Sequence, residues 1–146
     1  MPEKETLKRA AKDKAEGKSP STQAGEFVHE EIEHVREGKH GARSTKQAIA
    51  IGLSKARRAG VKLPPPGEGQ SEDTRERAAR DLEKGQRSSK KSAKRSRATG
   101  RALKREGHSA ASKAALSRHA RSVAAKRSAA SKSRSAKKAA ATRKKK

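Results

Sequence analysis

The chain has 146 residues, and its 40 Lys and Arg outnumber its 16 Asp and Glu, which leaves a formal net charge of +24. It contains no cysteine, so disulfides, zinc knuckles and thiol chemistry are excluded. Aromatic residues make up 1% of the chain and hydrophobic residues 29%, many of them alanines, and such chains rarely offset the entropy cost of folding over their full length. The composition predicts a mostly disordered protein with one small all-α element.

No apolar run approaches the roughly 20 residues that a membrane-spanning helix needs. The first 18 residues are charged throughout, unlike the apolar centre of a secretory signal. We therefore expect a cytoplasmic protein that has no membrane as a partner.

The N-terminal segment, residues 1–24, is rich in Lys, Glu and Ser. Leu7 is its only large apolar residue besides Met1. We expect this charged segment to be disordered, with at most a transient helix over residues 4–16.

Residues 25–63 hold almost all the remaining large apolar side chains and are predicted to form a helical hairpin. The first helix carries an apolar stripe at i, i+4 and i+7, with Phe27 beside it: Val28, Ile32 and Val35. Gly38 is a suitable stop for that helix. Ser44 with Gln47 three residues later is a capping-box pattern, which predicts a second helix from Thr45 to Ala59.

The predicted hairpin has a thin core. Gly52, in the middle of the second helix, costs about 1 kcal/mol relative to Ala, but it suits a close approach of the two helices. A segment of this size is at the limit of independent folding. We therefore expect the stability of 25–63 to depend on a protein partner, on self-association with a second copy of the chain, or on nucleic acid.

The next segments are a Pro- and Gly-rich linker, residues 64–71, and a short charged helix over 72–84, closed by Gly85. Residues 85–146 form a basic Ala-, Ser-, Lys- and Arg-rich tail. Its 22 Lys and Arg face a single acid, Glu106, whereas residues 1–84 carry 18 Lys and Arg against 15 acids. The two parts are therefore a polycation and a nearly neutral polyampholyte.

The tail makes the strongest functional case. Cations spread along a chain displace condensed counterions from nucleic acid, and the release of those ions drives binding. Because Ala has the best helix propensity, we expect the disordered tail to become helical on binding. The predicted nucleic-acid-binding residues are Lys90, Lys91, Lys94, Arg95, Arg97, Arg101, Lys104, Arg105, Lys113, Arg118, Arg121, Lys126, Arg127, Lys132, Arg134, Lys137, Lys138, Arg143, Lys144, Lys145 and Lys146.

The second hairpin helix offers further candidate contacts: Arg43, Lys46, Lys55, Arg57 and Arg58. A helix–turn–helix protein would place such a helix in the major groove. Only two helices are evident, however, and Gln47 is the only residue there suited to base edges. Non-specific phosphate contact or solvation is the favoured interpretation, and sequence-specific recognition is the alternative.

The first hairpin helix carries histidines and acids. His29 and His34 are at i and i+5, about 140° apart on a helix, whereas the H-E-x-x-H motif of metalloproteases needs i and i+4. They are interpreted as surface histidines, with a weak metal site as the alternative. The acids form a band interpreted as a solvated face, or alternatively as a competitor for the tail: Glu30, Glu31, Glu33 and Glu37. With no phosphate loop and no nucleophile motif, we expect no catalytic residue, metal or cofactor, and a protein that is not an enzyme.

The stretch from Gly38 to Arg57, GKHGARSTKQAIAIGLSKAR, carries a resemblance. It resembles a family of small, basic, largely uncharacterised bacterial proteins that share a KHG…S.KQAIAIGLSKAR.AG signature, and the likeness covers about residues 25–63. The tail resembles the Lys- and Ala-rich tails of linker histones and bacterial histone-like proteins. Together these resemblances imply a nucleoid-associated, histone-like protein.

Three functions are consistent with these observations. The leading one is non-specific binding of duplex DNA, with compaction or organisation of the DNA, because a chain with a single Phe lacks the aromatic side chains on which single strands stack. The second is an RNA- or ribosome-associated basic protein. The third is an adaptor whose hairpin docks a protein while the tail tethers it to nucleic acid.

Overall fold

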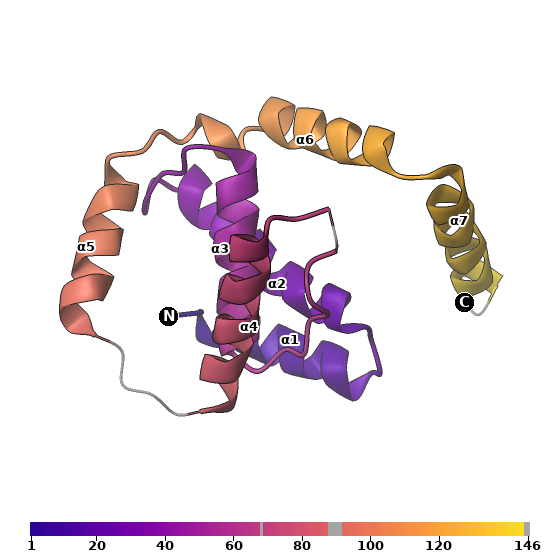
Figure 1. Cartoon of the computed structure of the whole chain (residues 1–146), viewed down its shortest axis with the longest axis horizontal. Helices are drawn as coiled ribbons and strands as arrows, with labels where there is room; N and C mark the ends of the chain where they lie inside the picture. Colours follow the sequence, from indigo (N-terminus) through magenta and orange to yellow (C-terminus); the bar gives the residue numbers. More distant parts are fainter. Residues whose placement is uncertain (68, 88–91, 145–146) are drawn as a thin grey trace. The chain divides into compact units, whose positions relative to one another are not determined.

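The computed structural model describes all residues except 68, 88–91 and 145–146 (Figure 1). Over the described residues the chain forms seven α-helices and one 3-10 turn, without strands. The prediction of a mostly disordered protein is therefore wrong. The chain divides into two compact units, Met1–Ser112 and Lys113–Lys146.

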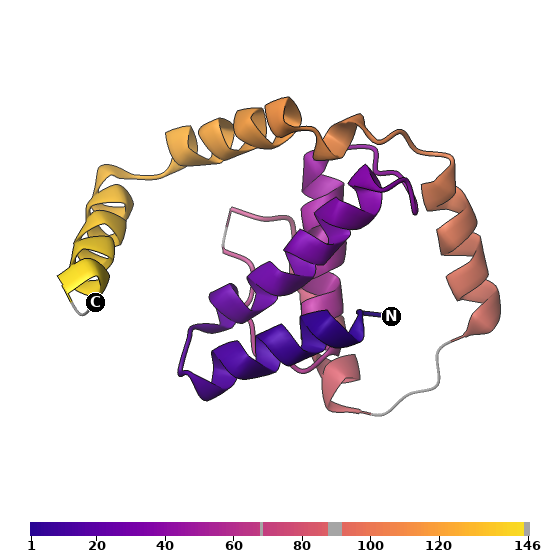
Figure 2. The same ribbon diagram turned by 180° about the vertical axis from the view of Figure 1, so that it is seen from behind.

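The first unit is built around four helices that pack in chain order. Helix α1 packs on α2, α2 on α3 and α3 on α4, and both views show these neighbours side by side (Figures 1 and 2). The elements of the unit are α1 (Lys4–Ala15), α2 (Pro20–Arg36), α3 (Thr45–Arg58), α4 (Glu72–Gln86), α5 (Ala93–Lys104) and the 3-10 turn η1 (Ser109–Ala111).

Small side chains let this core form with few large ones. The buried cluster consists of Ala10, Ala24, Phe27, Ala56, Val61 and Leu63, with Leu53 packed against it. At Gly52 the helices meet so closely that a Cβ atom would lie 2.7 Å from Val28 Cα, which confirms the predicted close approach. Close packing of Ala and Gly gains dispersion contacts that a count of large apolar residues overlooks. The composition predicted disorder wrongly because it gave no weight to the close packing of Ala and Gly.

Serine side chains start several of these helices. Ser19, Ser44, Ser71 and Ser92 each accept a hydrogen bond from the backbone N–H three residues later, at the beginning of α2, α3, α4 and α5. The predicted capping role of Ser44 is confirmed, but Gln47 accepts from the Arg43 backbone N–H at 2.7 Å rather than from that of Ser44. These caps satisfy N–H groups that would otherwise lack a partner.

The N-terminal segment is ordered rather than disordered. Helix α1 buries Thr6, Ala10 and Asp13. Its exposed edge is tied to its surroundings by ion pairs, with Arg9 Nε 2.6 Å from Glu26 Oε2 on α2 and Lys18 Nζ 2.7 Å from Asp13 Oδ1. The prediction of disorder considered residues 1–24 alone, whereas their charges pair with residues of α2 such as Glu26.

The predicted end of the fourth helix is also wrong. Helix α4 continues through Gly85 to Gln86. A Cβ atom on Gly85 would lie 2.2 Å from the Arg57 carbonyl oxygen, so this glycine serves the packing of α4 against α3. In the preceding segment, 64–71, the described residues form no helix.

The tail was predicted to begin at residue 85, whereas the boundary between the two units lies after Ser112. The backbone N–H groups of Gly41 and Ala42 donate to the carbonyls of Leu103 and Gly107, each at 2.9 Å. Thr45 Oγ1 donates to the Ala110 carbonyl at 2.7 Å, in a region where Ala110 and Ala111 are buried. Residues 103–111 therefore dock on the turn between α2 and α3 and belong to the first unit.

The second unit consists of α6 (Lys113–Lys126) and α7 (Ala129–Lys144). None of the described residues of either helix is buried, so alanine propensity and local hydrogen bonds account for them. Ser128 Oγ accepts from the Ser131 backbone N–H at 3.2 Å, and Arg127 donates to the Ser131 carbonyl at 3.0 Å. The expectation that the tail becomes helical only on binding is wrong, since it is helical without a ligand.

Among the described residues, none of the helices combines the length and apolar character that crossing a membrane requires.

Two helix glycines allow a matched test of the close approach. Gly52→Ala is expected to lower the free energy of unfolding by about 1–3 kcal/mol, because its Cβ meets the backbone of Val28. Gly25→Ala, in α2 with nothing within 4 Å of its Cβ, is expected to raise it by about 0.5–1 kcal/mol. Urea unfolding followed by circular dichroism measures both. Equal effects of the two substitutions would contradict the packing described here.

Candidate nucleic-acid interface

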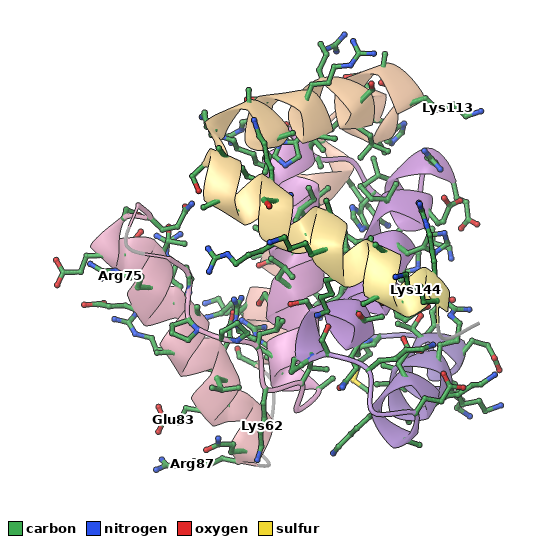
Figure 3. All side chains as sticks on the ribbon, turned by 90° about the vertical axis from the view of Figure 1, so that its right-hand side faces the viewer. Lys62, Arg75, Glu83, Arg87, Lys113 and Lys144 are labelled. Atoms are coloured by element: carbon green, nitrogen blue, oxygen red, sulfur yellow. The ribbon has the colours of Figure 1, made fainter. Side chains whose placement is uncertain are left out.

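The predicted tail cations lie on exposed helices. Every one of them that the structure describes is exposed to solvent, on α5, α6, α7 or the residue just after a helix. Lys113, at the start of α6, extends away from its helix (Figure 3). Four of the predicted residues lie outside the described part of the chain: Lys90, Lys91, Lys145 and Lys146.

Helix α5 concentrates its cations on one side. At about 100° per residue, five of them fall within an arc of about 100°: Lys94, Arg97, Arg101, Lys104 and Arg105. Arg95 lies outside this basic stripe. None of the residues of α5 is buried, so the stripe is accessible to a phosphate backbone.

The second unit has 13 Lys and Arg and no Asp or Glu. On α7 the cations are spread over more than half of the helix circumference: Lys132, Arg134, Lys137, Lys138, Arg143 and Lys144. A helix in the major groove of duplex DNA, about 12 Å wide, has phosphates on both sides. Cations around the helix suit that position better than a single stripe would.

The further candidates on α3 are placed differently from one another. Lys46 and Arg43 are exposed, although Arg43 Nη2 lies 3.5 Å from Glu106 Oε1. Arg58 Nη2 lies 2.7 Å from Asp81 Oδ1 on α4. Arg57 Nε is buried without a hydrogen-bond partner. Among the α3 cations, Lys46 is therefore the one whose charge is most accessible to a phosphate group.

Lys55 faces the protein interior. Its Nζ lies 2.6 Å from Glu31 Oε2 and 3.3 Å from Glu30 Oε1, and its side chain is 22% exposed. Both carboxylates are on α2, so Lys55 joins α3 to α2 through an ion pair. We therefore withdraw Lys55 as a candidate phosphate contact.

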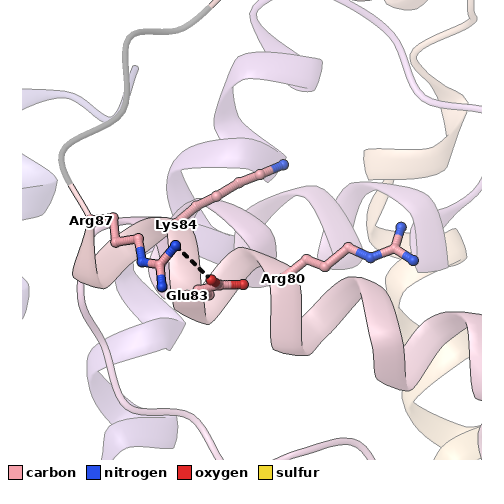
Figure 4. Close-up of a pocket in the computed structure, with 4 residues that line it drawn as sticks. All are labelled: Arg80, Glu83, Lys84 and Arg87. Atoms are coloured by element: carbon pink, nitrogen blue, oxygen red, sulfur yellow. Dashed lines mark ion pairs between the residues drawn. The ribbon is translucent and has the colours of Figure 1, made fainter.

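A surface hollow of about 290 Å³ lies along α4, bordered by Arg80, Glu83, Lys84 and Arg87. Figure 4 shows Arg87 turned toward Glu83 and Arg80 extending the other way. Arg87 Nη1 lies 3.2 Å from Glu83 Oε1. Three of these residues lie on α4 and Arg87 directly follows it, while Arg80 pairs with Glu76 at 2.8 Å rather than with Glu83.

A buried polar cluster lies between α2, α3 and the turn that joins them. Glu31 is 0% exposed and Glu30 4%. His40 Nε2 lies 3.1 Å from Glu31 Oε1, while the rings of His34 and His40 meet edge to face with centroids 6.1 Å apart. His34 and His40 have side chains only 13% and 16% exposed. The interpretation of His34 as a surface histidine on a solvated acidic face is therefore wrong.

This cluster was not predicted from the sequence, although the spacing of residues along α2 indicates it. Phe27, Glu31 and Val35 are spaced by four residues and so share one helix face, and both apolar members are buried. An acid between two core residues must find a partner, because an unpaired buried charge is costly. His40 lies beyond the end of α2, so helical spacing relates it neither to His29 nor to His34.

Glu3 supports the cluster from the N-terminus. Its Oε1 lies 2.9 Å from His34 Nε2 and 3.0 Å from Lys39 Nζ. Hydrogen bonds from His34 and Lys39 lower the pKa of Glu3 to about 2. Burial alone would raise the pKa of Glu30, but hydrogen bonds from Thr6 and the Glu3 backbone, together with Lys55, outweigh it and lower that pKa.

Residues 12–66 match a family of unknown function, DUF6496. The matched segment contains the α2–α3 hairpin, the buried Glu30 and Glu31 and the partly buried His34, His40 and Lys55, whereas the basic helices α5 to α7 lie outside it. Comparisons with curated proteins and with solved structures find no similar protein.

Proposed function

We propose that the protein binds nucleic acid non-specifically through its exposed basic helices, with duplex DNA as the preferred partner, and that it organises or compacts DNA in the bacterial nucleoid without catalysing a reaction. The Lys- and Ala-rich composition of the tail, which resembles that of histone-like proteins, favours this proposal over other uses of a basic chain.

The charge of the second unit carries the proposal. Its 13 cations stand on helices whose described residues are not buried, and no acid of the unit can neutralise them. Held at close spacing, these cations repel one another, and contact with phosphates relieves that repulsion while it releases counterions. Such binding is strong and independent of sequence, because phosphate contacts carry no base information.

Two features favour duplex DNA over other nucleic acids. Phe27, the only Phe of a chain without Trp or Tyr, is 1% exposed, so it is not available to stack on the bases of a single strand. The major groove of an RNA duplex is deep and narrow, whereas that of DNA admits an α-helix. Charge alone also supports RNA binding, and the test includes it for that reason.

Removal of the second unit tests the proposal. A chain that ends at Ser112 keeps the buried Ala110 and Ala111 and loses all 13 cations of the second unit. We expect its affinity for duplex DNA to fall by about tenfold or more at physiological salt, because fewer phosphates are contacted.

The control compares ligands on the full chain. Fluorescence anisotropy with labelled duplex DNA, duplex RNA and single-stranded DNA of equal length should rank duplex DNA first. Tighter binding of RNA would replace the DNA assignment with the ribosome- or RNA-associated alternative. Unchanged affinity of the shortened chain would refute the role of α6 and α7.

A further inference from the structure

Three potential metal ligands converge in the buried cluster. A carboxylate oxygen of Glu31 and a ring nitrogen from each of His34 and His40 all lie within 4.8 Å of one another. Glu31 and His34 are at i and i+3 on one face of α2, and His40 reaches them from the turn. Glu-x-x-His on a helix is the spacing used by carboxylate-bridged metal sites in helix bundles.

The Glu31 carboxylate is incompletely satisfied by the protein. Both of its oxygens are buried and accept no hydrogen bond, although Lys55 Nζ and His40 Nε2 lie within ion-pair distance of them. Close distances without hydrogen-bond geometry leave lone pairs unused. A fully buried carboxylate with unused lone pairs is an unusual feature, and a bound cation would account for it.

In the neutral form of each histidine ring, a hydrogen bond fixes the proton on one nitrogen and leaves the lone pair on the other. His40 Nδ1 lies 3.0 Å from the Gly41 carbonyl, which can only accept, so Nδ1 carries the proton and the neutral ring has its lone pair on Nε2, the atom that faces Glu31. His34 Nε2 donates to the Glu3 carboxylate, which leaves Nδ1 as the basic nitrogen. A histidine that ligates a metal ordinarily donates its other N–H to a carbonyl or carboxylate in this way.

We propose that Glu31, His34 and His40 bind a divalent transition-metal ion of the zinc class, with Glu3 as a positioning residue for His34. Imidazole and carboxylate ligands bind zinc at about 2.0–2.2 Å, which places the ligands of a tetrahedral ion about 3.4 Å from one another. Ligand atoms that lie up to 4.8 Å apart must therefore move closer by up to about 1.4 Å, through rotation of their side chains. Lys55 occupies the Oε2 side of Glu31 and leaves Oε1 toward His40. A surface hollow of about 190 Å³ is bordered by Glu3, Glu30 and His34, so one of the three ligands lies at its wall.

Such an ion would be structural. It would fasten His40 of the turn to α2, and the next two residues, Gly41 and Ala42, are those that hold residues 103–111 by backbone hydrogen bonds. The metal would thus stabilise the docking of the segment that leads into the second unit. This inference is independent of nucleic-acid binding, since no tail cation takes part.

The test is a titration of the full chain, freed of metal by a chelator, with Zn²⁺ in a calorimeter. We expect one Zn²⁺ per chain and a rise in the unfolding midpoint when Zn²⁺ is present, because an ion that binds only the folded state stabilises it. Glu31→Gln and His40→Gln should abolish both effects, and Glu3→Gln should weaken binding by about 10- to 100-fold. His29→Gln, an exposed histidine on the same helix, is the matched control and should bind like the wild type.

A gain-of-signal variant keeps the test decisive if a glutamine variant fails to fold. The chain has no cysteine, so His40→Cys introduces its only thiol, and a thiolate is also a zinc-class ligand. Addition of Co²⁺ should produce a sulfur-to-metal charge-transfer absorption in this variant and not in His29→Cys. Absence of that absorption in folded His40→Cys, or wild-type Zn²⁺ binding that survives His40→Gln, would overturn the site.

Discussion

Raising the salt concentration from 50 to 200 mM is expected to weaken the binding of the full chain to duplex DNA by roughly 10⁵-fold. If about ten phosphates are contacted, the logarithm of the affinity falls with the logarithm of the salt concentration with a slope of about −9. The exposed cations of α5, α6 and α7 are numerous enough to supply ten contacts. Anisotropy titrations of a labelled duplex across a salt series measure the slope directly.

A set of substitutions on α7 assigns the slope to the helices. Changing Lys132, Arg134, Lys137 and Lys138 to Gln removes four exposed cations and should flatten the slope by up to about 3.6. The matched control changes four exposed lysines of α1, where acids lie close by and pair with some of them: Lys4, Lys8, Lys12 and Lys14. The control should leave the slope nearly unchanged.

Duplexes of different sequence should give the same slope and nearly the same affinity, since contacts to phosphates do not read bases. A slope near −2, or a preference for one duplex that persists at high salt, contradicts the charge-driven mechanism. Either result would direct attention to a specific interface on the first unit, where Lys46 and Arg43 are exposed on or beside α3.

The local features of the hairpin could be predicted from sequence. Ser44 caps α3, Gly52 lies at a close helix contact, and Val61 and Leu63 pack back against the core. Gly38 follows the end of α2 with φ +73°, a conformation that favours glycine. Each of these features depends on a few neighbouring residues, so the sequence contains the information directly.

The extent of order could not be predicted in the same way. Composition emphasises large apolar residues, whereas Ala24, Ala48 and Ala56 become fully or almost fully buried through close contact between successive helices. Docking of residues 103–111 depends on backbone groups of Gly41 and Ala42, which no side-chain pattern reveals. Long-range backbone contacts of this kind placed the structural boundary after Ser112, far from the predicted one at 85.

The exposed tail cations and the cluster of Glu31, His34 and His40 differ in how far they could be predicted from sequence. The exposure of the candidate cations could be predicted from sequence because exposure is the default for Lys and Arg, and the described tail members are exposed. The buried cluster required knowledge of which face of α2 is covered. The spacing of Glu31 between Phe27 and Val35 was the only sequence feature that set it apart from Glu33 and Glu37, and no sequence pattern placed His40 of the turn beside it.

Lys55→Met is expected to lower the free energy of unfolding by about 3 kcal/mol. The substitution removes the cation 2.6 Å from Glu31 and 3.3 Å from Glu30, whose side chains are 1% and 2% exposed. Removal of one partner of a buried ion pair leaves an uncompensated charge, which is more costly than the loss of an exposed pair. Urea unfolding in the presence of a chelator measures the change without interference from a bound metal ion.

Lys46→Met is the matched control, because it removes the same charge from an exposed position of the same helix. It should change the stability by no more than about 0.5 kcal/mol. The two variants should bind duplex DNA about equally well under conditions in which both are folded, since Lys55 is directed at carboxylates rather than at solvent. If Lys55→Met instead weakened DNA binding far more than Lys46→Met while it left stability intact, Lys55 would be a phosphate contact and the ion pair that joins α3 to α2 would be dispensable.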